Sequence, residues 1–154
     1  MPERLEILAV GALDGSLRPA FDHYRRLIGN LAQLSVREVR EVSLRGRSPA
    51  EVLRDEGRRL AAALPARGTT VALDAGGRSY GSEAFAQALQ DWCRGGPVTF
   101  VIGGSLGLAD DIRQSAAERL SLSALTLPHQ LARVVLAEQL FRALKIARGQ
   151  TYHH

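Results

Sequence analysis

The chain has 154 residues, of which 45% are hydrophobic, and its formal net charge is +4. This length suits one compact core, so we expect residues 1–154 to form a single domain. No apolar run approaches the roughly 20 residues that a bilayer-spanning helix needs, and the opening residues lack the basic start and cleavage site of a signal peptide. We therefore expect a soluble, cytoplasmic protein with no membrane partner.

The basic residues are almost all of one kind, because Lys145 is the only lysine among twenty Lys and Arg residues. Guanidinium groups match phosphate and stack on bases, so this balance favours an anionic partner such as RNA. The aromatic content of 5% is too low for a surface that binds single strands chiefly by stacking. The single cysteine, Cys93, excludes an internal disulfide and a paired-cysteine metal site.

The first part of the chain alternates strand and helix patterns. Residues 5–10 form an apolar run that ends at a glycine, which predicts a buried strand. Residues 19–33 repeat apolar side chains at intervals of three and four, which predicts an amphipathic helix. Residues 35–42 alternate valine with charge and predict a strand near a sheet edge, with Arg37 and Arg40 solvated.

The same alternation continues through the middle of the chain. Residues 48–51 (SPAE) have the pattern of a capping box and predict a helix that runs to about residue 64. Residues 69–73 are rich in β-branched side chains and predict a strand, and residues 74–77 predict a turn. A helix over residues 82–93 should end at the glycines and proline that follow. The whole pattern predicts an α/β fold with parallel strand pairs.

A glycine turn at residues 103–107 (GGSLG) follows the apolar run of residues 98–102. Such a turn lets backbone approach a ligand where side chains would block it. The pattern G-x-S-x-G also occurs in hydrolases, with Ser105 as nucleophile, but no aspartate follows Asp111 to complete a triad. The glycine spacing differs from a dinucleotide fingerprint. A turn that merely joins a strand to a helix remains possible.

The last helix should span residues 129–147, with an apolar face that ordinary core packing would explain. The apolar positions are Leu131, Val134, Val135, Leu140, Phe141 and Leu144. The basic residues Arg133, Arg142, Lys145 and Arg148 are expected on other faces. With Glu138 as the only acidic residue after position 128, these side chains are expected to offer a phosphate-facing surface.

Three stretches carry a family resemblance: residues 102–108 (IGGSLGL), residues 120–146 with their LSALTLPHQ block, and the ending Tyr152-His153. They closely resemble the ribosomal large subunit methyltransferase H family of the SPOUT class, which methylates N3 of a pseudouridine in 23S rRNA. The resemblance covers essentially the whole chain. The LSALTLPHQ block and the Tyr-His ending are specific, whereas the glycine turn alone is not.

The resemblance implies a SPOUT-type fold, in which a parallel-rich sheet is flanked by helices. It also implies a trefoil knot in about residues 70–154, a rare exception to the rule against threaded chains. The implied protein is a homodimer that uses S-adenosylmethionine as cofactor and the assembled ribosome, through its 23S rRNA, as substrate. Because the sulfonium methyl is already activated, the implied reaction needs no metal. A knotted RNA-binding protein without catalysis remains an alternative.

The resemblance also assigns site residues. The cofactor contacts are expected at Leu73, Gly103, Gly104, Leu122, Ser123, Ala124, Leu125, Thr126 and Leu127. A Cβ at position 103 would be expected to crowd the ligand. The groups expected to act on the target nucleotide are His129, Arg142, Tyr152 and His153.

In the implied dimer, the tail of one subunit closes over the target nucleotide bound at the other. The positive charge of Arg142 and an imidazole from His129 or His153 would favour the anion of the pseudouridine imide. Family members more often carry a basic residue where this chain has His154. The arginines of residues 43–47 are expected either to meet RNA outside the target or to be solvated.

Overall fold

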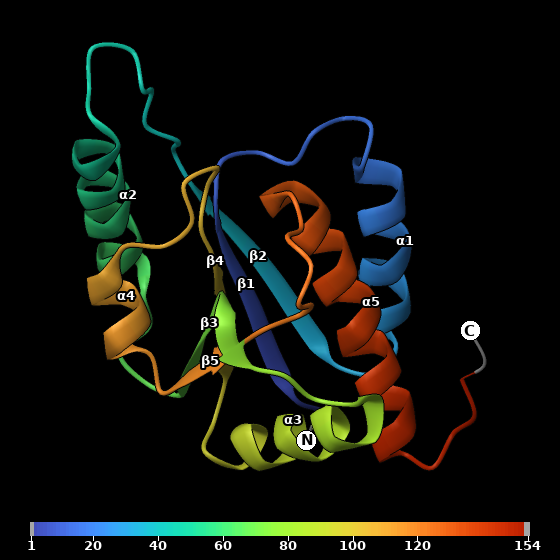
Figure 1. Cartoon of the computed structure of the whole chain (residues 1–154). Helices are drawn as coiled ribbons and strands as arrows, with labels where there is room; N and C mark the ends of the chain where they lie inside the picture. Colours follow the sequence, from blue (N-terminus) through green and yellow to red (C-terminus); the bar gives the residue numbers. More distant parts are fainter. Residues whose placement is uncertain (1, 153–154) are drawn as a thin grey trace.

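The computed structural model describes residues 2–152, which form a five-stranded sheet between two layers of helices (Figure 1). The elements in chain order are β1 Arg4–Val10, α1 Arg18–Gly29, β2 Gln33–Val39, α2 Pro49–Ala63, β3 Thr69–Arg78, α3 Ser82–Arg94, β4 Val98–Ile102, α4 Asp110–Ser115, β5 Glu118–Leu120 and α5 His129–Ala147. The strand order is β2-β1-β4-β3-β5, and all four neighbouring pairs are parallel. The α/β prediction with parallel pairs is therefore confirmed.

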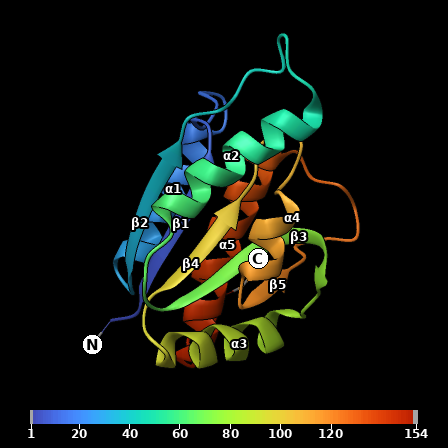
Figure 2. The same ribbon diagram turned by 90° about the vertical axis from the view of Figure 1, so that its left-hand side faces the viewer.

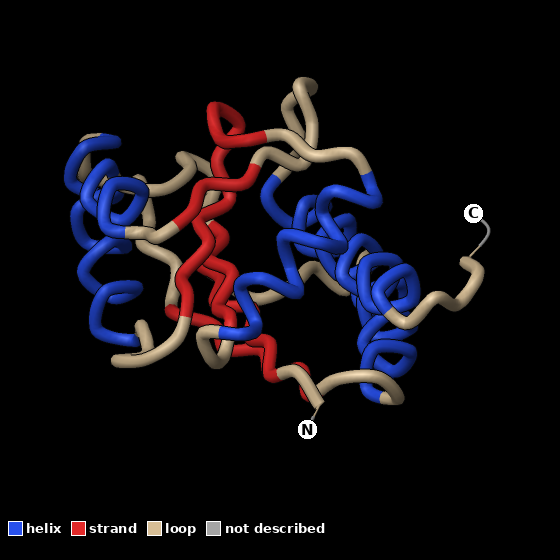
Figure 3. Tube along the Cα trace, turned by 90° about the horizontal axis from the view of Figure 1, so that it is seen from below, coloured by secondary structure: helices blue, strands red, loops and turns tan. Residues whose placement is uncertain are grey.

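Each face of the sheet packs a separate apolar core, because side chains alternate across a strand. Ile7 and Ala9 of β1 pack with α1, α3 and α5 on one face. Leu8 and Val10 pack with α2 and α4 on the other face. Figure 3 shows the strands between these two helix layers. All five residues of β4 are buried, which explains why this strand is a continuous apolar run.

Local sequence signals place most elements correctly. The capping box of α2 is present, since the amide of Glu51 donates to Ser48 Oγ at 3.2 Å and Glu51 Oε1 accepts from the amide of Ser48 at 3.3 Å. The edge position of β2 is also confirmed. Its Arg37 is exposed but not simply solvated, because its guanidinium binds Glu6 on the neighbouring strand at 2.9 Å.

Two predicted segments were wrong in part. The first predicted helix ends at Gly29 instead of residue 33, because residues from Gln33 onward pair with β1. The predicted turn at residues 74–77 belongs to β3, which continues to Arg78 with an irregularity in its pairing to β5. A Cβ on Gly77 would lie 2.7 Å from the carbonyl oxygen of Arg119, so this close approach of two backbones requires glycine.

Helix α5 has the predicted bounds, but one prediction about its faces was wrong. Arg133 is 2% exposed, although it was expected on a solvent face. Its guanidinium donates to Glu38 Oε2 of β2 at 2.5 Å and to the carbonyl oxygen of Gly11 at 2.9 Å. Arg133 therefore ties the start of α5 to the ends of β1 and β2.

Within residues 2–152, no helix combines the length and apolarity that crossing a bilayer would demand.

Candidate functional site

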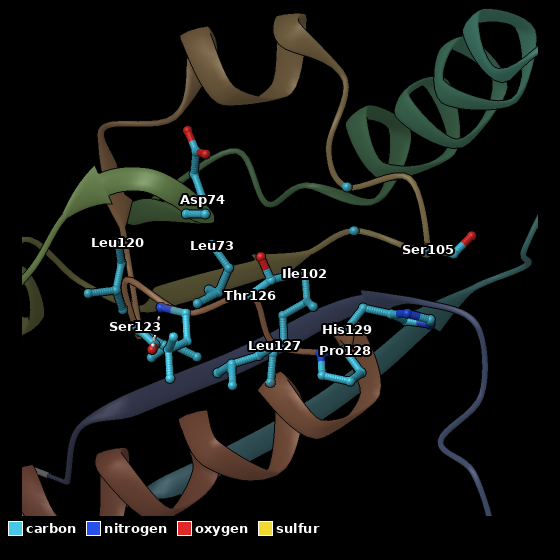
Figure 4. A pocket seen from close by; sticks show the side chains of 17 residues that line it. Leu73, Asp74, Ile102, Ser105, Leu120, Ser123, Thr126, Leu127, Pro128 and His129 are labelled. Carbon is cyan, nitrogen blue, oxygen red and sulfur yellow. Dashed lines mark hydrogen bonds between the residues drawn. The ribbon is translucent and has the colours of Figure 1, made fainter.

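A cavity of about 500 Å³ opens at the carboxyl ends of β4 and β5, beside the middle of β3 (Figure 4). Its wall is formed by residues 73–75 of β3, the glycine turn after β4, the segment of residues 121–128 after β5, and the first turn of α5. Ligands of open α/β sheets bind outside the carboxyl ends of the strands. The sheet therefore places this cavity where a ligand site is expected.

Most of the predicted cofactor residues meet at this cavity. Its wall includes Leu73, Gly103, Gly104, Leu122, Ser123, Leu125, Thr126 and Leu127. Ala124 was also predicted, but it is exposed and does not line the cavity. Residues from positions 73, 103 and 122–127 thus converge although they are far apart in the chain. Their role in binding a cofactor stays a prediction.

The glycine turn is closed by its own backbone. The amide of Gly107 donates to the carbonyl oxygen of Gly104 at 3.0 Å, and Gly107 has a φ of 80°. A Cβ on Gly103 would collide with the carbonyl oxygen of Gly107. Glycine at position 103 is therefore required by the turn itself. The expectation that a Cβ would crowd a ligand stays a prediction, because the turn alone already excludes a side chain here.

Serine hydroxyls hold the segment of residues 121–128, which has no regular secondary structure. Ser121 is 6% exposed, and its amide donates to the carbonyl oxygen of Arg78 at 2.9 Å. Ser121 Oγ donates to the carbonyl oxygen of Ser123 at 3.1 Å, and Ser123 Oγ accepts from the amide of Leu125 at 2.9 Å. These bonds fix a cavity wall whose remaining backbone groups are available to a ligand. Leu125 itself is 77% exposed.

His129 and Ser105 lie at one end of the cavity (Figure 4). His129 is the first residue of α5, where the helix dipole favours negative charge. Within the described part of the chain, no hydrogen bond joins His129 to Ser105, and no carboxylate binds His129. The arrangement lacks the nucleophile, base and acid of a hydrolase triad.

Arg142 and Tyr152 do not reach this cavity within one chain. The rise of about 1.5 Å per residue puts Arg142 about 20 Å along α5 from His129. Arg142 donates to Glu138 Oε1 from Nε at 3.0 Å and from Nη2 at 2.6 Å, and its guanidinium carbon lies 4.5 Å from the centre of the Tyr152 ring. We call Glu138, Phe141, Arg142 and Tyr152 the tail cluster. Two of the predicted groups are therefore together, but apart from the cavity.

The tail cluster is held by contacts of several kinds. The rings of Phe141 and Tyr152 meet edge to face with centres 5.0 Å apart. Hydrogen bonding to Glu138 raises the pKa of Arg142, so the guanidinium stays charged. Burial, reinforced by the Glu138 carboxylate, raises the pKa of Tyr152, so the phenol stays neutral at pH 7. The predicted His153 and the adjoining His154 lie outside the described residues.

The expected phosphate-facing surface of α5 is wrong for Arg133, and two of its other members form ion pairs within the chain. Arg133 is buried, Arg142 binds Glu138, and Arg148 binds Glu3 at 2.9 Å. Arg148 also donates to the carbonyl oxygen of Leu31, as a further tie to the rest of the fold, and to that of Leu144 within α5. Arg133 and Arg148 therefore tie α5 to other elements of the fold, whereas Arg142 belongs to the tail cluster.

The sequence prediction missed several residues of the cavity wall. They are Asp74, Ala75, Ile102, Leu120, Pro128 and Ala132, whereas Ser105 and Gly107 belong to the glycine turn already singled out in the sequence. Asp74 is the acidic residue among them, and its Oδ1 accepts from the amide of Gly76 at 3.0 Å. Its position directly after Leu73 at a strand end was the available sequence signal, but the composition of residues 74–77 had suggested only a turn.

Neither a metal-binding cluster nor a reactive thiol is found among the described residues. Among residues 2–152, no three His, Cys, Asp or Glu side chains cluster as a metal site. Burial raises the pKa of the Cys93 thiol to about 11. A thiol in this state is a poor nucleophile at neutral pH.

The comparison with known families favours a methyltransferase over a hydrolase or an RNA-binding protein without catalysis. A family model described as "Predicted SPOUT methyltransferase" matches residues 4–153. The chain belongs to the SPOUT methyltransferase family.

Two relatives in the SPOUT methyltransferase family are similar over nearly the full chain, and both are named Ribosomal RNA large subunit methyltransferase H. The protein from Rubrobacter xylanophilus is 45% identical over 157 residues, which cover 99% of each chain. The protein from Gluconacetobacter diazotrophicus is 43% identical over 152 residues, which cover 97% of this chain and 96% of that one.

Solved structures support the same fold at low sequence identity. A probable methylase family protein from Haemophilus influenzae gives a TM-score of 0.61 at 15% identity, with 100% of this chain and 72% of that chain covered. A probable methyltransferase from Bordetella pertussis gives 0.59 at 15% identity, with 92% and 95% covered. AviRb from Streptomyces viridochromogenes, solved with AdoMet, gives 0.50 at 17% identity, with 98% and 60% covered. The predicted SPOUT-type sheet is confirmed, and the knot stays a prediction.

Proposed function

We propose that this protein transfers the methyl group of S-adenosylmethionine to N3 of a pseudouridine in 23S rRNA of the assembled ribosome. The observation that carries the proposal is the cavity, which gathers eight of the nine predicted cofactor residues at the carboxyl ends of β4 and β5. The similarity of 45% identity to a Ribosomal RNA large subunit methyltransferase H supports the choice of substrate. The ribosomal substrate places the reaction in the cytoplasm.

The residues of the cavity fit such a cofactor. A volume of about 500 Å³ lies within the range of small-molecule sites. Leu73, Leu122 and Leu127 offer an apolar enclosure for a flat ring, while the backbone of residues 121–128 offers donors and acceptors. Asp74 supplies a carboxylate at the rim, which complements a positively charged ligand. The bound cofactor would supply a methyl group activated on a sulfonium.

The acceptor needs help of a different kind. N3 of pseudouridine is a weakly acidic imide that must lose its proton, so a positive environment favours the reactive anion. His129 lies in the cavity wall at the start of α5, where the helix dipole adds positive potential. Arg142 supplies a permanent charge, already oriented by Glu138 and the Tyr152 ring.

The separation of about 20 Å along α5 supports a composite site in a homodimer. In that arrangement Arg142 and Tyr152 of one protomer complete the cavity of the other, and His153 closes over the target nucleotide. Two apolar side chains of the segment that leads into α5 and of its first turn are available for a partner surface: Leu125 is 77% exposed and Leu131 is 36% exposed. We further propose one domain over residues 1–154, knotted in about residues 70–154.

The test is methyl transfer from labelled S-adenosylmethionine to intact ribosomes that lack the modification. We expect label in 23S rRNA and N3-methylated pseudouridine among the nucleosides by mass analysis. Label in another nucleoside would contradict the proposed target while leaving the methyltransferase assignment intact. Calorimetry with the cofactor alone measures the cavity separately from the target.

A further inference from the structure

The connection between β2 and α2 extends beyond the carboxyl edge of the sheet, the edge at which the cavity opens (Figures 1 and 2). We call residues 40–48 the basic finger. Its turn consists of Leu44, Arg45, Gly46 and Arg47, all exposed. A protrusion of this length is not needed to join two neighbouring elements, since most such connections have about four to six residues.

The tip of the basic finger is a hydrogen-bonded turn. Ser43 Oγ accepts from the amide of Arg45 at 3.1 Å, and the carbonyl oxygen of Leu44 accepts from the amide of Arg47 at 3.1 Å. Arg47 Nη1 donates to the carbonyl oxygen of Ser43 at 3.2 Å. Gly46 has a φ of 72°, a conformation that glycine adopts without strain. The tip therefore has a defined shape.

The base of the basic finger is anchored to α2. The amide of Val42 donates to Glu56 Oε2 at 3.1 Å, and Glu56 is buried, with only 4% of its surface exposed. Arg59 Nη1 donates to the carbonyl oxygen of Arg40 at 2.8 Å. These bonds hold the part of the connection that leaves β2 against the helix.

Glu56 also links this base to the cavity. Its Oε1 lies 3.2 Å from where a Cβ on Gly104 would stand, and Gly104 is part of the cavity wall. One buried carboxylate thus contacts the base of the finger and the glycine turn. The position of the finger relative to the cavity is therefore set by packed atoms.

The charge of the basic finger and of the adjoining α2 is largely uncompensated at the tip. Residues 40–59 contain six arginines and four carboxylates, and one of those carboxylates, Glu56, is buried. Glu51 is engaged in the capping box, and Asp55 pairs with Arg58. Within the described part of the chain, Arg45 has no hydrogen-bonding or ion-pair partner for its guanidinium. Beside it, Leu44 is 46% exposed.

We propose that the basic finger docks on the RNA backbone of the large ribosomal subunit, outside the target nucleotide. This inference rests on the proposed function. Arg45 and Arg47 bind phosphates, which guanidinium groups match with paired donors, and Leu44 covers an exposed sugar or base face. The fixed base then sets the cavity at a constant distance from the docked RNA.

The experiment compares two substitutions that change the charge equally at opposite edges of the sheet. Arg45→Glu acts at the tip of the finger. Arg67→Glu is the matched control, because Arg67 is exposed and lies between α2 and β3, at the amino edge of the sheet. Two quantities are measured for each full-length variant: binding to intact large subunits by sedimentation, and the Kd for S-adenosylmethionine by calorimetry.

We expect Arg45→Glu to weaken subunit binding about tenfold at moderate salt, with less salt dependence than the wild type shows. Arg67→Glu should change binding by about twofold or less, by the same electrostatic argument. The Kd for the cofactor should be unchanged in both variants. Equal binding by the two variants would overturn the proposal.

A photocrosslinker at position 44 identifies the partner class. Crosslinks to 23S rRNA support RNA docking, whereas crosslinks confined to a ribosomal protein overturn it. The test also separates this proposal from the proposed function. Finger-dependent binding without methyl transfer would leave the finger intact and reject the function; methyl transfer with Arg45→Glu equal to the control would do the reverse.

Discussion

The cavity and the tail cluster are built in different ways, although α5 contributes to both. The cavity is formed by backbone turns and apolar side chains, and residues from several connections complete it within one chain. The tail cluster is formed by a charged pair and two aromatic rings on the later part of α5 and the tail. About 20 Å of helix lies between them. The cavity is thus complete within one chain, whereas the tail cluster lies apart from it and would reach it only in the homodimer proposed above.

Removal of the tail should have the largest effect, because it removes the proposed role of the tail cluster in methyl transfer while leaving cofactor binding at the cavity. Deletion of residues 152–154 should lower kcat by about a thousandfold, because the groups proposed to act on the target are lost. The Kd for S-adenosylmethionine should stay within about threefold, because the cavity wall contains none of these residues. Deletion of His154 alone is the control. Loss of cofactor binding in the larger deletion would contradict a two-part site.

Arg133 fixes the position of α5, the helix that contributes residues to both regions. Arg133→Met removes the partner of Glu38 and of the Gly11 carbonyl, so we expect a loss of about 3 kcal/mol in the free energy of unfolding. Urea unfolding measures this loss. Arg67→Met, on the exposed surface, should change the same quantity by about 0.5 kcal/mol or less. A similar small effect for both would show that the Arg133 network contributes little to stability.

Gly103→Ala should damage the cavity and leave the tail cluster intact. The new Cβ would meet the carbonyl of Gly107, so the turn must deform and the Kd for the cofactor should rise about tenfold. Calorimetry measures the change. Gly81→Ala is a suitable control, because nothing lies within 4 Å of its Cβ position. Unchanged affinity in Gly103→Ala would show that the cofactor does not depend on this turn.

Ser105→Ala should have the smallest effect. Ser105 is exposed at one end of the cavity and has no catalytic partner among residues 2–152. We expect kcat and KM for methyl transfer to change by about twofold or less, as for other exposed substitutions. A loss of transfer by orders of magnitude would indicate a direct role for the hydroxyl.

Much of the cavity could be predicted from the sequence because its parts are local. The apolar run of β4 and the glycines after it specify a strand followed by a tight turn. The assignment of Leu73, Gly103 and residues 122–127 to the cofactor came from the family resemblance, which carries information that periodicity lacks. Asp74 was missed because turn composition does not reveal that β3 continues past Leu73 beside β5.

The sequence by itself determined the alternation of strands and helices, the start of α2, the bounds of α5 and the glycine turn. These features depend on neighbouring residues, through side-chain period, capping and backbone freedom. Only the tertiary structure decided which arginines are free. Arg133 is buried because Glu38 and Gly11 lie near it in space, whereas Arg45 is exposed because the connection around it leaves the sheet. Charge and hydropathy are properties of a residue, but the partner that neutralises a charge comes from distant parts of the chain.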